Sequence, residues 1–285
     1  ASPAGMAGLV LWLDATNVDG LSNTTLSDGG SVSEWKDLSG KGNHAGQDET
    51  SRQPKLLADG INTKPAVKFN KANGNYLKTV GFDSGQDLSI FMVFNSSSTE
   101  SERIYAHGDG YDLLSVFQNG SDGFHARIWA YSSNTGLSRT AHGSIETDAS
   151  SQPGLNYLLS YRYEYSSNRS VLAINGQKEI YISDAPHDPT LSNKHSYIGA
   201  HPNPVPQFDG SLAEIIVIDG KVSESIAAEI YYYLSKKWNL GTTMDSDGDS
   251  IADATDTTPA GLIAEPKPVS LKVVFEDNAG NAGAT

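Results

Sequence analysis

The chain contains no cysteine, no long apolar run and few basic residues, and each of these absences excludes a class of protein. It has no Cys among its 285 residues, whereas a cytosolic protein of this size usually carries a few. A secreted bacterial protein can lack disulfides and be stabilised by metal ions instead. It has no run of about 18 apolar residues, the length that a membrane-spanning helix needs, and no signal-peptide pattern. The chain starts abruptly at Ala1 and stops at Thr285 in mid-pattern, and we expect it to be a piece of a longer protein.

Basic residues are outnumbered by acidic ones. The chain has 20 Lys and Arg against 34 Asp and Glu, a formal net charge of −14. Such a surface repels phosphate backbones and anionic lipids, so we expect neither nucleic acid nor a membrane as a partner. A surface with this much negative charge suits the binding of divalent cations. Hydrophobic residues make up 38% and glycines number 28, which excludes both a disordered chain and a helical bundle.

Short apolar runs, separated by Gly, Asn, Ser and Asp clusters, fill most of the chain. Asn175-Gly176 between two such runs is the strongest hairpin signal. Many short strands with frequent turns predict an all-β sandwich, jelly roll or barrel. The predicted strands cover residues 9–13, 66–69, 88–95, 103–107, 113–118, 124–131, 157–163, 170–175, 179–182, 196–200 and 211–218.

One segment has helical periodicity instead. Apolar residues recur at spacings of three and four from Ile226 to Trp238, Ser223 is placed to cap the helix, and Gly241 lies just past its end. This pattern predicts an amphipathic helix packed on the sheets. The composition then shifts to Asp, Thr and Ser, followed by a stiff Pro-containing stretch and an alternating pattern at 269–275. We expect a main domain over 1–241, a linker over 242–267, and the first strand of a following β module over 268–285.

Residues 245–256 carry acidic side chains at the spacing of a calcium-binding loop. Oxygen ligands fall at loop positions one, three, five, nine and twelve, and a main-chain carbonyl at position seven adds another. Five carboxylates this close would repel one another strongly without a cation between them. The alternative is a solvated acidic linker. The predicted ligands of Ca²⁺ are Asp245, Asp247, Asp249, the carbonyl of Ile251, Asp253 and Asp256.

The loop departs from the helix–loop–helix form. Ser250 replaces Gly at position six, Asp256 replaces Glu at position twelve, and no convincing helices flank it. Together with its closing residues 256–259, the loop resembles a thrombospondin type 3 calcium repeat. That resemblance implies a linker between modules that calcium stiffens, as such repeats do in bacterial surface proteins.

Three stretches carry a resemblance for the main domain. They are residues 9–15 with Trp12, residues 35–45 followed by 65–69, and residues 208–218 followed by the helix that ends at Lys237-Trp238. Together they resemble the laminin-G-like, concanavalin A-like jelly roll of bacterial surface and secreted proteins, over about residues 5–241. The resemblance implies glycan or protein binding in most members and glycoside hydrolysis in some relatives. Trp12 and Trp35 are large anchors at the edge of a core, and we expect these motif residues to be scaffold.

Glycoside hydrolysis requires two carboxylates that face each other across a cleft, roughly 5–10 Å apart. Glu214 and Glu179 each stand alone on their predicted strands. The chain also lacks a Gly-x-Ser-x-Gly elbow and a His-Glu-x-x-His helix. We therefore predict a binding protein and not an enzyme.

Two loops hold the residue types that sugar recognition uses, which are carboxylates, amides, imidazoles and aromatic rings. The first loop, residues 105–112, contains glycines. The second loop, residues 200–209, contains three prolines that keep it stiff. The alternatives are an ordinary hairpin turn and a rigid crossover without a ligand. A loop at 119–123 ranks lower. The predicted sugar-binding residues are His107, Asp109, Tyr111 and Asp112 in the first loop, and His201, Asn203, Gln207 and Asp209 in the second.

Tyr161, Tyr163 and Tyr165 lie on one face of a predicted strand, as a packed ladder or a stacking platform. Taken together, these features predict a calcium-dependent carbohydrate-binding module of a large extracellular bacterial adhesin that attaches cells to glycans, for example in biofilms. Both loops would form one site, with any calcium in it beside Asp109 or Asp209. The alternatives are a non-binding spacer stiffened by calcium and, less favoured, a glycoside hydrolase domain.

Overall fold

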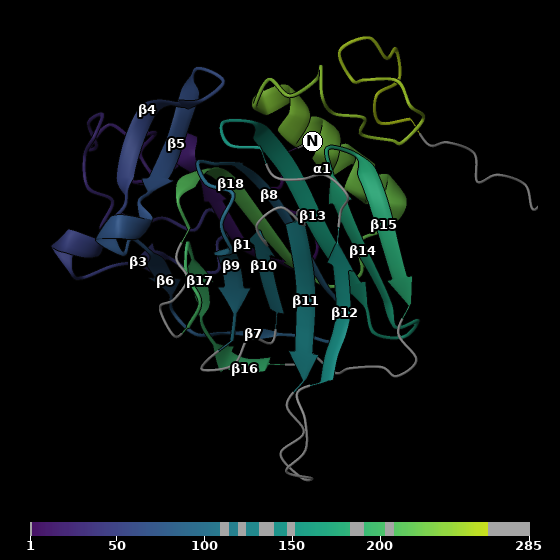
Figure 1. The fold of residues 1–285 in the computed structure, drawn as a ribbon, viewed down its shortest axis with the longest axis horizontal. Coiled ribbons are helices and arrows are strands. Elements are labelled where there is room, and N and C mark those ends of the chain that lie inside the picture. Colours follow the sequence, from purple (N-terminus) through teal and green to yellow (C-terminus); the bar gives the residue numbers. More distant parts are fainter. Residues whose placement is uncertain are drawn as a thin grey trace, which may run out of the picture.

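The computed structural model describes residues 2–108, 114–118, 124–130, 140–146, 152–182, 191–202 and 208–261, and it shows a β-sandwich (Figure 1). Among these residues, one eight-stranded sheet has the order β15-β14-β13-β8-β18-β5-β4, with β1 also paired to β18. The facing eight-stranded sheet has the order β12-β11-β10-β9-β17-β6-β3-β2, and a small ribbon pairs β16 with β7. This architecture confirms the predicted all-β jelly-roll sandwich.

The first sheet consists of β1 (Leu9–Asp14), β4 (Lys55–Ile61), β5 (Lys64–Phe69), β8 (Leu88–Ser96), β13 (Asn156–Glu164), β14 (Arg169–Ile174), β15 (Gln177–Ile182) and β18 (Gly210–Asp219). The second consists of β2 (Glu34–Trp35), β3 (Ala45–Gly46), β6 (Leu77–Thr79), β9 (Glu102–His107), β10 (Leu114–Gln118), β11 (Phe124–Ala130), β12 (Thr140–Glu146) and β17 (Ser196–Ile198). The ribbon strands are β7 (Phe82–Ser84) and β16 (Leu191–Lys194), and the short 3-10 helices are η1 (Ala15–Asn17), η2 (Thr50–Arg52) and η3 (Lys71–Asn73).

The structure contains strands that the sequence patterns did not predict. Strands β2, β3, β6 and β7 have only two or three residues, too few to show an alternation. Strand β12 is largely polar, so it carries no apolar period either. The predicted strand at 269–275 lies outside the described residues.

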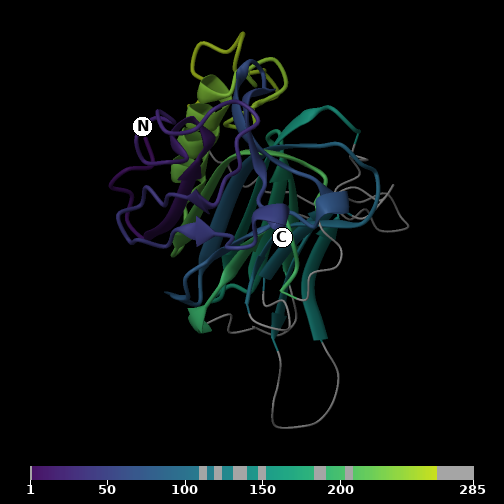
Figure 2. The ribbon, with the colours of Figure 1, turned by 90° about the vertical axis from the view of Figure 1, so that its left-hand side faces the viewer.

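Helix α1 (Glu224–Lys237) packs on the outer side of the first sheet, and in Figure 2 it lies on the same side of the sandwich as the N-terminal segment. The Ser223 hydroxyl caps the helix by accepting the Ile226 N–H at 3.3 Å. At the other end Asn239, and not Gly241, adopts the left-handed conformation, with φ 55°, and the Leu240 N–H donates to the Ser235 carbonyl. Asn tolerates this conformation, so the left-handed residue that follows the helix lies two positions before the glycine, and the helix itself ends at Lys237. No helix in the described part of the chain has the length and apolar character to cross a membrane.

A buried network around Glu214 joins β1, β18 and α1. The carboxylate of Glu214 is fully buried and accepts hydrogen bonds from the indoles of Trp12 (2.7 Å) and Trp238 (2.6 Å). The Lys237 ammonium lies 2.7 Å from the same carboxylate and 2.5 Å from that of Asp14. Burial raises the pKa of the Glu214 carboxyl, and the Lys237 charge acts against that rise. These motif residues therefore hold the layers together, in agreement with their predicted scaffold role.

The tyrosines of β13 form a packed ladder and not an exposed platform. Tyr161 and Tyr163 are both buried in the core. The Tyr161 hydroxyl also pairs with the Ser170 hydroxyl at 2.9 Å. Of the two alternatives for this strand, the structure supports packing.

Candidate functional site

The acidic loop brings three of its predicted calcium ligands together. One carboxylate oxygen each from Asp245, Asp247 and Asp249 lies within 4.8 Å of the others. Burial, followed by the nearby charges of Asp249, Asp256 and Asp245, raises the pKa of the Asp247 carboxyl. A cation would relieve this repulsion, and carboxylate oxygens are the ligands that Ca²⁺ prefers. The triad therefore fits a hard divalent cation.

The other predicted ligands, Asp253, Asp256 and the Ile251 carbonyl, do not belong to this triad. The Asp253 carboxylate accepts both the N–H (2.8 Å) and the hydroxyl (2.7 Å) of Ser246, so it holds the shape of the loop. Within the described residues, Oδ2 of Asp256 is buried without a hydrogen-bond partner, which suits a metal ligand. The Ile251 N–H donates to Asp249 at 2.8 Å, and the role of its carbonyl stays a prediction.

The acidic loop is docked on the sandwich, next to the turn between β14 and β15. Met244 is fully buried in the same hydrophobic core as the sheets. Gly176, at the turn, approaches the loop so closely that a Cβ there would lie 1.9 Å from the Asp245 carbonyl oxygen. Figure 1 shows the loop beside α1 and these strands. The residues just after the predicted boundary at 241 therefore take part in the packing of the main domain.

Replacing Gly176 with Ala is expected to destabilise the domain more than replacing Gly154 with Ala. Both glycines are left-handed, with φ 89° and 86°, so Ala adds about 1–2 kcal/mol of backbone strain at each. Only at Gly176 does the new methyl group meet the Asp245 main chain, since nothing lies within 4 Å of a Cβ at Gly154. The clash adds roughly 1–3 kcal/mol. Urea denaturation of both variants measures the difference, and equal losses would contradict the docked loop.

The predicted sugar-binding loops are described only in part. His107 is 1% exposed, its Nδ1 lies 3.1 Å from the Ser196 hydroxyl, and its ring stacks on Phe82 at 4.6 Å. These contacts give His107 a packing role, and its contact with a sugar stays a prediction. Five predicted residues lie outside the described part of the chain: Asp109, Tyr111, Asp112, Asn203 and Gln207.

The second loop contacts the start of β9, whereas the first loop follows the end of that strand. The Asp209 N–H donates to Glu102, the first residue of β9, at 3.0 Å, whereas His107 is its last residue. The described flanks of the two loops are thus separated by the length of a six-residue strand, about 17 Å, and His107 and Asp209 do not share a site. The Asp209 carboxylate pairs with the Lys68 ammonium at 3.0 Å, which disfavours the calcium expected beside it. His201 is half-buried.

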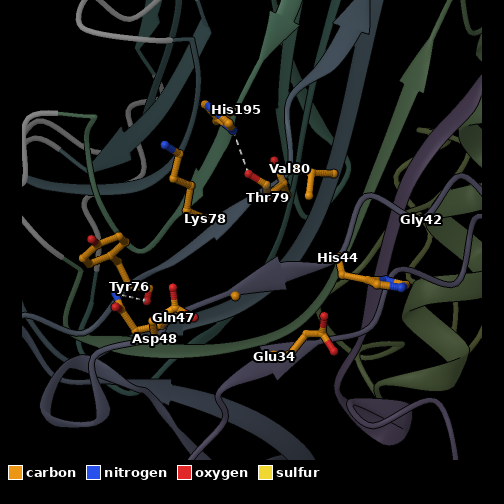
Figure 3. Close-up of a pocket in the computed structure, with 11 residues that line it drawn as sticks. Glu34, Gly42, His44, Gln47, Asp48, Tyr76, Lys78, Thr79, Val80 and His195 are labelled. Atoms are coloured by element: carbon orange, nitrogen blue, oxygen red, sulfur yellow. Dashed lines mark hydrogen bonds between the residues drawn. The ribbon is translucent and has the colours of Figure 1, made fainter.

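A groove that sequence analysis missed lies on the second sheet, over β2, β3 and β6 (Figure 3). Glu34, Gly46 and Lys78 are cross-strand neighbours there. Because Gly46 has no side chain, a hollow remains between the other two residues. The cavity measures about 480 Å³ and is lined by Glu34, Gly42, His44, Gly46, Gln47, Asp48, Tyr76, Lys78, Thr79, Val80 and His195.

The two histidines of the groove offer opposite hydrogen-bonding groups. Nδ1 of His44 accepts the Asp37 N–H at 3.0 Å, so the neutral ring carries its proton on Nε2. Nδ1 of His195 lies 2.8 Å from the Thr79 carbonyl oxygen, which can only accept, so this Nδ1 carries the proton and Nε2 has the free lone pair. His44 can therefore donate to a ligand through Nε2, while His195 can accept.

The other walls add a ring, a cation and carboxylates. Figure 3 shows Tyr76 and Lys78 on the opposite side of the view from Glu34 and His44. The Gln47 side-chain amide donates to the Tyr76 carbonyl at 3.4 Å. This bond links the segment that follows β3 to the residue just before β6. An aromatic ring with a polar tip, donors and acceptors around one hollow can bind a polyhydroxylated molecule. Sequence reasoning missed this set because it comes from four separate segments, one of which has the pattern of a structural turn.

Comparison with solved structures finds the same β-sandwich fold in other proteins. No family model and no curated protein matches the chain. Domain 4 of AbnA, an extracellular GH43 arabinanase from Geobacillus stearothermophilus solved with arabinotriose, is similar with a TM-score of 0.52 and 17% identity, over 77% of this chain and 96% of that one. The binding domain of Paraclostridial Mosquitocidal Protein 1 gives a TM-score of 0.52 and 12% identity, over 80% of this chain and 52% of that one.

A sialidase from Trypanosoma rangeli is a more distant neighbour. It gives a TM-score of 0.49 and 13% identity, over 83% of this chain. This chain spans about a third of that protein, 34% of its length. At such identities the two neighbours with a TM-score of 0.52 show the sandwich fold alone.

Proposed function

We propose that this protein is a carbohydrate-binding module that holds its glycan in the groove over β2, β3 and β6. The observation that carries the proposal is the hollow at Gly46, which is lined by Tyr76, His44 and His195, two of which are histidines with complementary tautomers. A ring face suits the apolar side of a pyranose, and donors and acceptors suit its hydroxyls. The arabinanase domain with the same fold was solved with arabinotriose, so this sandwich can carry a sugar.

We further propose a calcium-dependent module of an extracellular bacterial adhesin that is not an enzyme. The acidic loop and the net charge of −14 support calcium-replete surroundings. The loop lies beside α1, on the opposite side of the view in Figure 1 from β3 and β6. Calcium would therefore support sugar binding through the stability of the sandwich and not through contact with the sugar.

Substituting Gly46 with Phe is expected to weaken glycan binding at least tenfold. A Cβ at this position makes only an ordinary contact, 3.6 Å from the Ser33 carbonyl oxygen, so the fold tolerates it while the phenyl ring fills the hollow. Tyr76→Ala should cost roughly tenfold through the lost ring contact. A glycan array in calcium-containing buffer identifies the sugar, and isothermal titration of the variants with that sugar measures the loss.

Ala58→Phe is the matched control, because Ala58 is exposed on β4 of the other sheet. It adds the same ring and should bind like the wild type. Wild-type affinity in Gly46→Phe would exclude the groove as the site. If no glycan binds in calcium, the alternative of a spacer module replaces the proposal, and release of reducing sugar from a polysaccharide would favour the hydrolase alternative.

A further inference from the structure

A second cavity, of about 260 Å³, lies on the first sheet at the N-terminal end of α1. Its walls come from the start of β8, from β13 and β14, and from the segment that enters the helix. It is thus distinct from the groove, which belongs to the other sheet. Its lining includes two serines, Ser89 and Ser223, together with the charged residues Arg162, Glu164, Arg169, Lys221 and Glu224.

Among the described residues that line this cavity, cationic side chains outnumber carboxylates. Glu224 pairs with Arg162 at 2.9 Å, with Lys178 at 3.2 Å and with Arg169 at 3.7 Å. The remaining cation, Lys221, pairs with Glu164. Among the described residues that line the cavity, three cations thus accompany two carboxylates, and this excess of positive charge occurs on a chain with a net charge of −14.

Both carboxylates remain ionised at neutral pH. Burial alone would raise the pKa of the Glu224 carboxyl, but the charges of Arg162 and Lys178 hold it below its ordinary value. The hydrogen bond from Lys221 lowers the pKa of the Glu164 carboxyl. Each of the two carboxylates therefore contributes a full negative charge, and the positive charges still outnumber them.

Arg162 is buried with part of its hydrogen-bonding capacity unused. It is 6% exposed, one terminal nitrogen bonds both oxygens of Glu224 (2.9 and 3.0 Å), and the other donates to the Val222 carbonyl at 3.3 Å. Its Nε is buried with no partner among the described residues. A buried donor without an acceptor costs about 1–3 kcal/mol, and the guanidinium contributes its positive charge to the cavity that it lines.

We propose that this cavity is an oxyanion site, which binds a carboxylate, sulfate or phosphate group. The planar donors of Arg169 suit such groups, and Lys221 stands at the exposed side, with 60% of its side chain accessible. The cavity also adjoins the first turn of the 14-residue helix α1, and the positive end of the helix dipole favours negative charge there. Glu224 is the internal competitor for the same cations.

Calorimetric titration with sodium sulfate, sodium glucuronate and glucose tests this proposal, with chloride adjusted to hold the ionic strength constant. Sulfate is expected to bind the wild-type chain. Arg169→Ala should weaken binding at least tenfold, and Glu224→Gln should strengthen it several-fold because the neutral amide no longer competes. The matched control is Arg52→Ala, which removes an exposed arginine paired with Glu49 elsewhere, and circular dichroism confirms that each variant is folded.

Binding of sulfate alone would identify a free inorganic anion as the ligand, and binding of glucuronate as well would extend the site to acidic sugars. The proposal is overturned if neither the wild type nor Glu224→Gln binds either anion, if Arg169→Ala binds like Arg52→Ala, or if glucose binds as well as glucuronate. Gly46→Phe should leave sulfate binding unchanged, so the groove and the oxyanion site can fail separately.

Discussion

Replacing Glu214 with Ala is expected to lower the free energy of unfolding by about 3–5 kcal/mol. The substitution leaves the Lys237 ammonium, which is 18% exposed, without its carboxylate partner on β18. It also leaves the indole N–H groups of Trp12 and Trp238 without the acceptor that they share. Strands β1 and β18 and the helix α1 segment therefore lose the carboxylate that joins them. The loss corresponds to a fall of roughly 10 °C in Tm for a domain of this size, and urea denaturation with tryptophan fluorescence measures it.

Glu229→Ala provides the control on the same helix. Glu229 is exposed on α1, and its removal should change stability by no more than about 0.5 kcal/mol. The triple variant Asp14→Asn, Glu214→Leu, Lys237→Met removes all three charges of the network and should regain part of the loss, because no unpaired buried charge remains. If Glu214→Ala lost no more than Glu229→Ala, the network would not hold the layers together.

Calcium is expected to raise the free energy of unfolding of the whole domain by about 2.7 kcal/mol at a concentration one hundred times its Kd. The reason is that the carboxylate triad sits on a segment docked in the core through Met244 and against Gly176. A cation that orders the loop thereby stabilises the strands beneath it. Differential scanning calorimetry with calcium and with chelator measures the shift, roughly 5–10 °C.

Asp247→Asn should abolish most of this calcium effect, since it removes a charge from the centre of the triad with little change in shape. Asp59→Asn is the control, because Asp59 is an exposed carboxylate on β4. Magnesium should stabilise less than calcium, as it requires a stricter octahedral shell. A Tm that is identical with calcium and with chelator would mean that residues 245–256 form a solvated acidic linker.

Much of the fold follows from local patterns. Apolar runs predicted the long strands, and Asn175-Gly176 predicted the β14–β15 hairpin, where Asn175 has φ 49° and Gly176 has φ 89°. The spacing of Ile226, Ile230 and Leu234 predicted α1. These features depend on neighbours a few residues apart, so they can be read before any tertiary contact is known. Strands of two residues, such as β2 and β3, have no such local signal.

The candidate sites were less predictable. Proximity within the acidic triad was predictable because its members are two residues apart, so the chain itself holds them near one another. The burial of His107 was not, because it depends on Phe82 and Ser196, which pack against it from distant parts of the chain. The two predicted loops contain suitable residues, but the register of β9 places their described flanks at opposite ends of a strand.

The sequence by itself determined the class of fold, the helix and the acidic loop, since each depends on spacing along the chain. Tertiary structure alone decided where the loop docks, which carboxylate of the scaffold is buried, and where a sugar could bind. The groove joins His44, Tyr76 and His195, and the second cavity joins Arg162 to Glu224. Such constellations arise from strand order and register, and a list of residues in chain order does not contain that information.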